Sequence, residues 1–202
     1  PRVVKGVVRL LDASGKDLVM VETVGVGQTE LGIMGVADTV VVVLVPEAGD
    51  ALQAFKAGLA EVADVFVVNK ADRPGAQQMV RALHTMLAMG EKKEGGWVPP
   101  VVATQALSGE GVEELHQAIE RHRQWMVDSS HLQARRRERR RAEFLETVEE
   151  ELSRRLHGAL KADPTLASAL RRVEEGTEEP YAAALKALAG PLRGWLAAPG
   201  EG

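Results

Sequence analysis

The segment Val40–Asp72, VVVVLVPEAGDALQAFKAGLAEVADVFVVNKAD, decides the fold that the sequence predicts. It contains two runs of mostly β-branched, apolar residues, Val40–Val45 and Val65–Asn69, and Ala51–Ala63 between them has helical spacing. Because neither run alternates with polar residues, each predicts a strand that is buried on both faces, as in a parallel sheet. The segment therefore predicts a β-α-β unit, with Val40–Val45 as a central strand.

The regions on either side continue this alternation of strands and helices. We expect a helix over Val3–Ala13 that ends at Gly15, a strand over Leu18–Glu22, a helix over Pro74–Met89, a strand over Pro100–Thr104 and a helix after Gly111. Repeated β-α units predict an α/β fold with a doubly wound, mostly parallel sheet. Ligands of such sheets bind outside the carboxyl ends of the strands.

The chain changes character after about Arg121 and predicts an all-α extension. A long helix over His131–His157 is charged but carries one apolar stripe at helical spacing: Phe144, Leu145, Val148, Leu152 and Leu156. Two shorter helices follow, the first from Asp163-Pro164 to Gly176 and the second over Pro180–Ala189. We interpret the run Arg135–Arg141, RRRERRR, as a solvated helix face with Glu–Arg pairs.

Composition excludes several classes of protein. The chain has 202 residues, 45% of them hydrophobic and only 3% aromatic, so Val, Leu and Ala must build its core. A net charge of −4 argues against a general nucleic-acid binder. The absence of Cys excludes disulfides and Cys-ligated metals, and it fits the reducing cytoplasm. The longest apolar run, Thr39–Pro46, is far shorter than the roughly 20 residues of a membrane helix, so we expect no membrane partner.

Three polar motifs directly follow predicted strands. They are Glu22–Glu30 (ETVGVGQTE), Asn69–Asp72 (NKAD) and Thr104–Gly111 (TQALSGEG). Because the carboxyl ends of parallel strands meet at one edge of a sheet, we expect the three loops to lie side by side. Each could by itself be an ordinary polar turn; their residue types and their order along the chain distinguish them from such turns.

The motif NKAD resembles NKxD, with which GTPases read guanine. The carboxylate of Asp72 can accept two hydrogen bonds, from N1–H and the exocyclic amino group of guanine, which adenine cannot supply in that geometry. Asn69 can join the loop to the base edge, and the aliphatic stem of Lys70 can cover the face of the base.

The other two motifs resemble further GTPase loops. In TQALSGEG, the backbone N–H that follows Ala106 would donate to guanine O6. Gln105 stands where GTPases usually have Ser, and Leu107 follows Ala106. A contact made through the backbone tolerates both of these side chains. In ETVGVGQTE, which resembles the phosphate-sensing DxxG loop, Glu22 would hold Mg²⁺ through water and Gly25 would approach the γ-phosphate of GTP. Gln28 is a candidate for orienting the attacking water.

Together these motifs resemble the MeaB/ArgK family of P-loop GTPases, formerly called LAO/AO transport system kinases, over residues 1–125. That family also has Glu in place of Asp in the sensing loop. Gly49–Gly58 resembles its additional switch loop and matches it at these residues: Asp50, Gln53, Lys56 and Gly58. Ala57 stands where the family commonly has a second Lys, so this chain lacks that side chain in the loop.

The resemblance implies a homodimeric, GTP-hydrolysing chaperone of an adenosylcobalamin-dependent acyl-CoA mutase, such as methylmalonyl-CoA mutase. Such chaperones gate cofactor loading and protect the mutase from inactivation. Residues 1–125 would then be the C-terminal part of the GTPase domain, and 126–202 the helical extension for dimerisation or partner binding.

The phosphate-cradling motif GxxxxGK[ST] is absent from these 202 residues. We therefore expect the sequence to be a fragment of a longer GTPase. The alternative is a non-catalytic interaction module derived from a GTPase. A nickel-insertion GTPase ranks last, because there is no Cys and the His residues are scattered at 84, 116, 122, 131 and 157.

Overall fold

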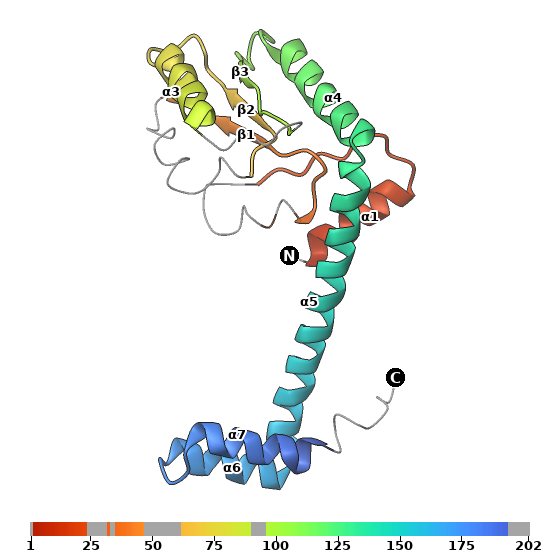
Figure 1. The fold of residues 1–202 in the computed structure, drawn as a ribbon, viewed down its shortest axis with the longest axis vertical. Coiled ribbons are helices and arrows are strands. Elements are labelled where there is room, and N and C mark those ends of the chain that lie inside the picture. The colour runs from red at the N-terminus through yellow and green to blue at the C-terminus, as the bar shows by residue number, and fades with distance from the viewer. Residues whose placement is uncertain (1, 24–31, 33–34, 47–61, 90–95, 194–202) are drawn as a thin grey trace. The chain divides into compact units, whose positions relative to one another are not determined.

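The computed structural model describes residues 2–23, 32, 35–46, 62–89 and 96–193 (Figure 1). The chain divides into two compact units, Pro1–Arg139 and Arg140–Gly202. The elements of the described part are α1 Arg2–Ala13, β1 Val41–Leu44, β2 Val65–Val68, α3 Ala76–Met89, β3 Val101–Ala103, α4 Val112–Asp128, α5 His131–Ala162, α6 Pro164–Glu174 and α7 Pro180–Ala189. The predicted helix over Ala51–Ala63 lies largely outside the described residues, which resume at Val62.

The first unit is built on a parallel sheet with the order β1-β2-β3. All four residues of β2 are buried, and their side chains alternate between the two faces. Phe66 and Val68 share a core cluster with Leu83 of α3, whereas Val65 and Val67 share another with Ala118 of α4. Helices therefore cover both faces of the sheet (Figure 1), and the predicted doubly wound α/β fold is confirmed.

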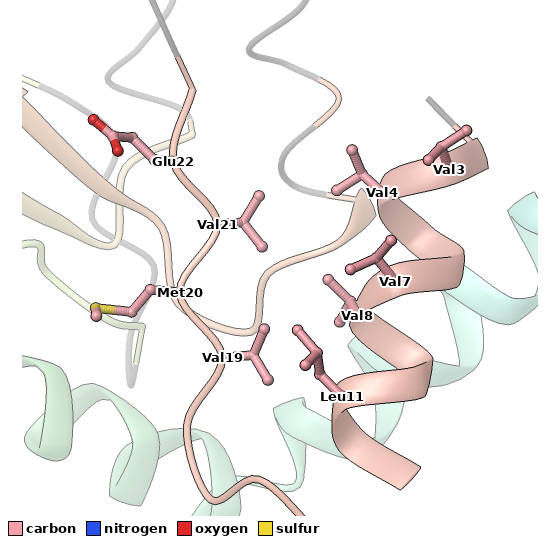
Figure 2. Close-up of a pocket in the computed structure, with 9 residues that line it drawn as sticks. All are labelled: Val3, Val4, Val7, Val8, Leu11, Val19, Met20, Val21 and Glu22. Atoms are coloured by element: carbon pink, nitrogen blue, oxygen red, sulfur yellow. The ribbon is translucent and has the colours of Figure 1, made fainter. Parts of the chain in front are cut away.

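The prediction of a strand over Leu18–Glu22 is wrong, because residues 18–23 have no strand partner among the described residues. Two of the apolar residues of this segment face α1 instead of joining the sheet. Val19 and Val21 are half-buried and point toward α1, whereas Met20 is 88% exposed and points away (Figure 2). An apolar groove of about 270 Å³ separates this extended segment from the face of α1 that carries Val4, Val8 and Leu11 (Figure 2).

The prediction that Val40–Val45 is a central strand also needs correction. In the described sheet β1 lies at an edge and β2 is central. Val43 of β1 is consequently 58% exposed, although its neighbour Leu44 is buried. The apolar run identified a strand correctly, but apolar residues alone do not give the order of strands in a sheet.

The second unit contains the rest of α5 together with α6 and α7, which lie side by side (Figure 1). Both predicted starts are confirmed: Asp163 Oδ1 accepts hydrogen bonds from Thr165 N at 2.7 Å and Leu166 N at 3.2 Å, and α7 begins at Pro180. Glu178, in the turn between the helices, accepts from Arg172 and Lys186. None of the described helices combines the length and the apolar character that crossing a membrane requires.

Helix α5 has no fully buried residue, and four of the five residues of its predicted apolar stripe are exposed, whereas Leu156 is half-buried. Phe144 is 67% exposed, and Leu145, Val148 and Leu152 are 46%, 38% and 45% exposed. These four residues, called the α5 stripe below, form an apolar surface on a helix whose other residues are mainly charged.

Candidate nucleotide-binding site

The loops after β2 and β3 lie side by side at the carboxyl end of the sheet. Residues 69–72 follow β2, and residues 104–111 follow β3. The parallel ladder extends into both loops, since Thr104 N donates to Val68 O at 2.9 Å and Ala71 N donates to Thr104 O at 3.0 Å. Two of the three predicted loops therefore meet, as parallel pairing requires.

The side chain of Asn69 joins these two loops. Its Oδ1 accepts hydrogen bonds from Thr104 Oγ1 at 3.2 Å and from Ala106 N at 3.1 Å. Because both donors come from the β3 loop, the amide oxygen is fixed toward that loop. The remaining amide group, Nδ2, is then a donor with a defined orientation at the sheet edge.

Lys70 and Asp72 complete the first loop. Lys70 has a φ of 56°, a left-handed conformation that costs a non-glycine residue roughly 1 kcal/mol or more and that is concentrated at functional sites. The Asp72 carboxylate is 55% exposed, and its ion pair with Arg73 spans 3.9 Å, too far for a hydrogen bond. The carboxylate therefore retains the capacity to accept hydrogen bonds from a ligand.

The second loop is closed on itself. Gln105 and Glu110 form an antiparallel bridge, with Gln105 N donating to Glu110 O at 2.9 Å, and Gln105 Nε2 donates to Glu110 Oε2. Leu107 is fully exposed at the tip of this loop. Gly111 ends the loop at a φ of 76°, where an added Cβ would lie 2.1 Å from Ala103 O. Glycine is therefore required at the point where α4 begins.

The remaining predicted site residues lie apart or outside the described structure. Glu22 is described and exposed, and it points away from α1 (Figure 2). Gly25, Gln28, Asp50, Gln53 and Lys56 fall outside the described residues. Across the described ranges no three His, Asp or Glu side chains gather into a metal site. A single carboxylate such as Glu22 still fits Mg²⁺, which keeps several waters and takes other ligands from nucleotide phosphates.

A family comparison identifies this arrangement. The model of the methylmalonyl-CoA mutase-associated GTPase MeaB matches residues 2–161. The chain belongs to the MeaB family. A Pyrococcus abyssi protein, itself a GTPase candidate, is 41% identical over 179 residues, which are 88% of this chain and 55% of that protein. The mouse mitochondrial methylmalonic aciduria type A homolog is 33% identical over 130 residues, which are 63% of this chain and 31% of that protein.

A solved structure of a LAO/AO transport system kinase has a similar fold, with a TM-score of 0.69 at 29% identity. The match covers 91% of this chain and 60% of that one. The chain thus spans about half the length of the curated relatives it matches. The fold and the family resemblance inferred from the sequence are both confirmed by these comparisons.

Sequence reasoning missed a second polar cluster in this MeaB-family chain, at the amino ends of the strands. Asp64, directly before β2, accepts hydrogen bonds from Val40 N at 2.8 Å and from Arg135 Nη1 of α5 at 3.2 Å. Its backbone oxygen accepts from Trp97 Nε1 at 2.7 Å. Asp64 therefore ties together the segments that lead into all three strands and the start of α5.

His122 of α4 is completely buried in this cluster. Its Nδ1 lies 2.9 Å from Thr39 Oγ1, and its Nε2 lies 3.4 Å from Asp64 Oδ1 without a hydrogen-bond partner among the described residues. Burial lowers the pKa of His122, and the charge of Arg135 lowers it further against the opposing effects of Asp64 and Asp38. The imidazole is therefore neutral near pH 7.

Asp38, which precedes β1, binds the next turn of α5. Its carboxylate accepts from Arg136 Nη2 at 2.5 Å and from Arg139 Nη1 at 2.8 Å. Burial would raise the pKa of Asp38, but the hydrogen bonds and charges of the two arginines outweigh it and hold that pKa below its ordinary value. The prediction that Arg135–Arg141 is only a solvated face is thus wrong for Arg135 and for these two arginines.

No local pattern in the sequence marks this second cluster. Asp64 stands directly before β2 and Asp38 stands three residues before β1, which is a weak signal, and the arginine run is equally typical of an exposed helix. Only the fold brings these distant residues together.

Proposed function

We propose that this chain carries the guanine-reading part of a MeaB-type GTPase. The observation that supports it most directly is the link between the two loops by Asn69, whose Oδ1 accepts from Thr104 and Ala106. That link leaves three groups at the sheet edge for a ligand: the carboxylate of Asp72, Nδ2 of Asn69 and the backbone N–H of Leu107.

These three groups complement guanine. The Asp72 carboxylate would accept from N1–H and from the 2-amino group, and charged acceptors of this kind make strong hydrogen bonds. Asn69 Nδ2 would donate to an acceptor on the base edge, and the N–H of Leu107 would donate to O6. Adenine has no N1–H and carries a donor at position 6, so it would leave the carboxylate and this N–H unpaired, at a cost of about 1–3 kcal/mol each.

The phosphate-facing part of the function depends on residues whose roles are inferred from the family. Glu22 would hold Mg²⁺ through water, Gly25 would approach the γ-phosphate, and Gln28 would orient the attacking water. Bound Mg²⁺ would neutralise charge on the phosphates. The second switch would contain Asp50, Gln53 and Lys56.

The partner we propose is an adenosylcobalamin-dependent acyl-CoA mutase in the cytoplasm. Support comes from the family, whose description names methylmalonyl-CoA mutase. Guanine nucleotide would gate cofactor loading and protection of that mutase. The exposed α5 stripe supports the further proposal that residues 126–202 form a homodimer or a partner surface, because open apolar surface of this kind favours association.

GTP turnover by the full-length gene product, with and without purified acyl-CoA mutases, tests this function. We expect slow turnover alone and a several-fold change when the cognate mutase is added. A protein that hydrolyses GTP at a rate unaffected by every acyl-CoA mutase would contradict the chaperone role but leave the GTPase proposal standing. A protein that neither binds nor hydrolyses GTP would contradict both.

A further inference from the structure

The loop Gln105–Glu110 is braced more strongly than a simple turn requires. Its base is closed by the backbone bridge, with Gln105 N donating to Glu110 O at 2.9 Å, and again by the side chains of the same two residues. Inside the loop, Ser108 N and Gly109 N both donate to Gln105 O, at 3.1 and 2.9 Å. The backbone N–H, the backbone carbonyl and the side-chain Nε2 of Gln105 therefore all form hydrogen bonds within the loop.

This bracing leaves the tip of the loop as the part that faces outward. Ala106 N is already committed to Asn69 Oδ1 at 3.1 Å. Leu107, the next residue, has a fully exposed side chain, and within the described part of the chain its N–H has no hydrogen-bond acceptor. The N–H of Leu107 is therefore held ready for an external acceptor by bonds on both sides of it.

We propose that Gln105 and Glu110 are positioning residues that fix the Leu107 N–H for the O6 atom of guanine. This inference rests on the proposed guanine site and names the pair that prepares one of its contacts. Holding a donor in place before binding reduces the ordering cost that the ligand would otherwise bear. The side-chain pair is exposed, so its effect on affinity should be moderate.

The identity of residue 105 supports this role. A Ser at this position would end one bond beyond Cβ and would not reach the Glu110 carboxylate as the longer Gln amide does. Gln105 therefore leaves the backbone contact to O6 available and also supplies the side-chain N–H that donates to Glu110.

The test compares three nucleotides that differ in one atom or group. GDP has both O6 and the 2-amino group, inosine diphosphate keeps O6 but lacks the amino group, and 6-thio-GDP replaces O6 by the weaker acceptor sulfur. Dissociation constants are measured calorimetrically on the full-length protein and on E110A, E110Q and the control E114A, whose carboxylate is exposed on the first turn of α4. Thermal melting checks that each variant is folded.

We expect E110A to weaken GDP and inosine diphosphate by the same factor, about three- to tenfold, as loss of one hydrogen bond implies. Binding of 6-thio-GDP should change by less than about twofold, because its contact at position 6 is already weak. E110Q keeps an oxygen acceptor for Gln105 and should stay close to the wild type, as should E114A.

Equal weakening of all three nucleotides by E110A would overturn the proposal, because the brace would then act on the loop in general. Unchanged GDP affinity in E110A would overturn it as well. These outcomes leave the guanine site itself intact, whereas a wild-type protein that fails to bind GDP would overturn the proposed function and this inference with it.

Discussion

The two ends of one parallel sheet are built in opposite ways. At the carboxyl end, Asp72 and the tip of the Gln105–Glu110 loop are exposed. Their polar groups have defined orientations and can still form hydrogen bonds with a ligand. At the amino end, Asp38 and Asp64 bind arginines of α5, and His122 is fully buried. Polar groups satisfied within the protein indicate stability, whereas oriented and exposed groups indicate binding.

We therefore expect changes at the amino end to lower stability, and changes to the base-reading groups to alter nucleotide binding. Three substitutions test the amino end of the sheet, at Asp64, Arg139 and His122, and Gly111→Ala tests a carboxyl-end residue that is not a base-reading group.

Removing the carboxylate of Asp64 should have the largest effect on folding. Asp64→Ala deletes the acceptor of Val40 N and leaves the half-buried Arg135 without its ion-pair partner. We expect the free energy of unfolding to fall by about 3 kcal/mol, at the lower end of the range for broken buried pairs, because both side chains are only part-buried. Urea denaturation measures this, with the exposed Asp17→Ala as the control. A loss of unfolding free energy below about 1 kcal/mol would mean that Asp64 contributes little to stability.

Gly111→Ala, at the carboxyl end of the sheet, should lower the free energy of unfolding by at least about 2 kcal/mol. The reason is the combination of a φ of 76° with a Cβ only 2.1 Å from Ala103 O. Gly109→Ala is the matched control, because Gly109 has a φ of 81° but open space around its Cβ position. Gly109→Ala should lower the free energy of unfolding only by the cost of placing alanine in a left-handed backbone conformation, about 1–2 kcal/mol. Equal losses of unfolding free energy in the two variants would mean that the close approach to Ala103 is unimportant.

Arg139→Gln should lower the free energy of unfolding by about 1–2 kcal/mol, since charged hydrogen bonds to Asp38 and to the Val36 carbonyl are lost. Arg137→Gln, two residues away on an exposed position, should stay within about 0.5 kcal/mol. Urea denaturation of the pair distinguishes a docked arginine from a solvated one. Indistinguishable variants would restore the view of the whole arginine run as a solvent-exposed face.

Substitution of His122 should have the smallest effect, which appears in the pH dependence of the free energy of unfolding. Its pKa in the folded protein lies below the ordinary value of 6.5, so the unfolded chain takes up a proton first as the pH falls. The contribution of His122 is therefore complete above about pH 6.5 and is lost as the pH falls toward its folded pKa. In His122→Gln the slope of unfolding free energy against pH between 6.5 and 5 should decrease. An unchanged slope would mean that the imidazole does not titrate in this way.

The sequence predicts the carboxyl end better than the amino end because the signals there are local. An apolar run such as Val65–Val68 followed at once by Asn69–Asp72 identifies both a strand and its loop. The amino-end cluster combines Asp38, Asp64, His122 and Arg135, which are far apart in the chain and follow no periodicity.

Non-local pairing also explains the other differences between prediction and structure. Leu18–Glu22 is a short, mostly apolar run like a buried strand, but forming a strand depends on a hydrogen-bonding neighbour that no local pattern reveals. The position of β1 at the edge of the described sheet is likewise a property of the strand order. The pair of Gln105 and Glu110 is close in sequence, yet only the backbone bridge brings the two side chains together.

Asp72 is the residue that we expect to read guanine, and one binding measurement tests this role most directly. GDP, ADP and xanthosine diphosphate are titrated calorimetrically into the full-length protein and its Asp72→Asn variant. The wild type should prefer GDP. Asp72→Asn should bind GDP about a hundredfold or more weakly and favour xanthosine diphosphate, because the Asn amide donates to O2 of xanthine where the carboxylate accepted from guanine. Unfolding free energy should change by less than about 0.5 kcal/mol. An Asp72→Asn protein that keeps its preference for GDP over ADP would contradict the claim.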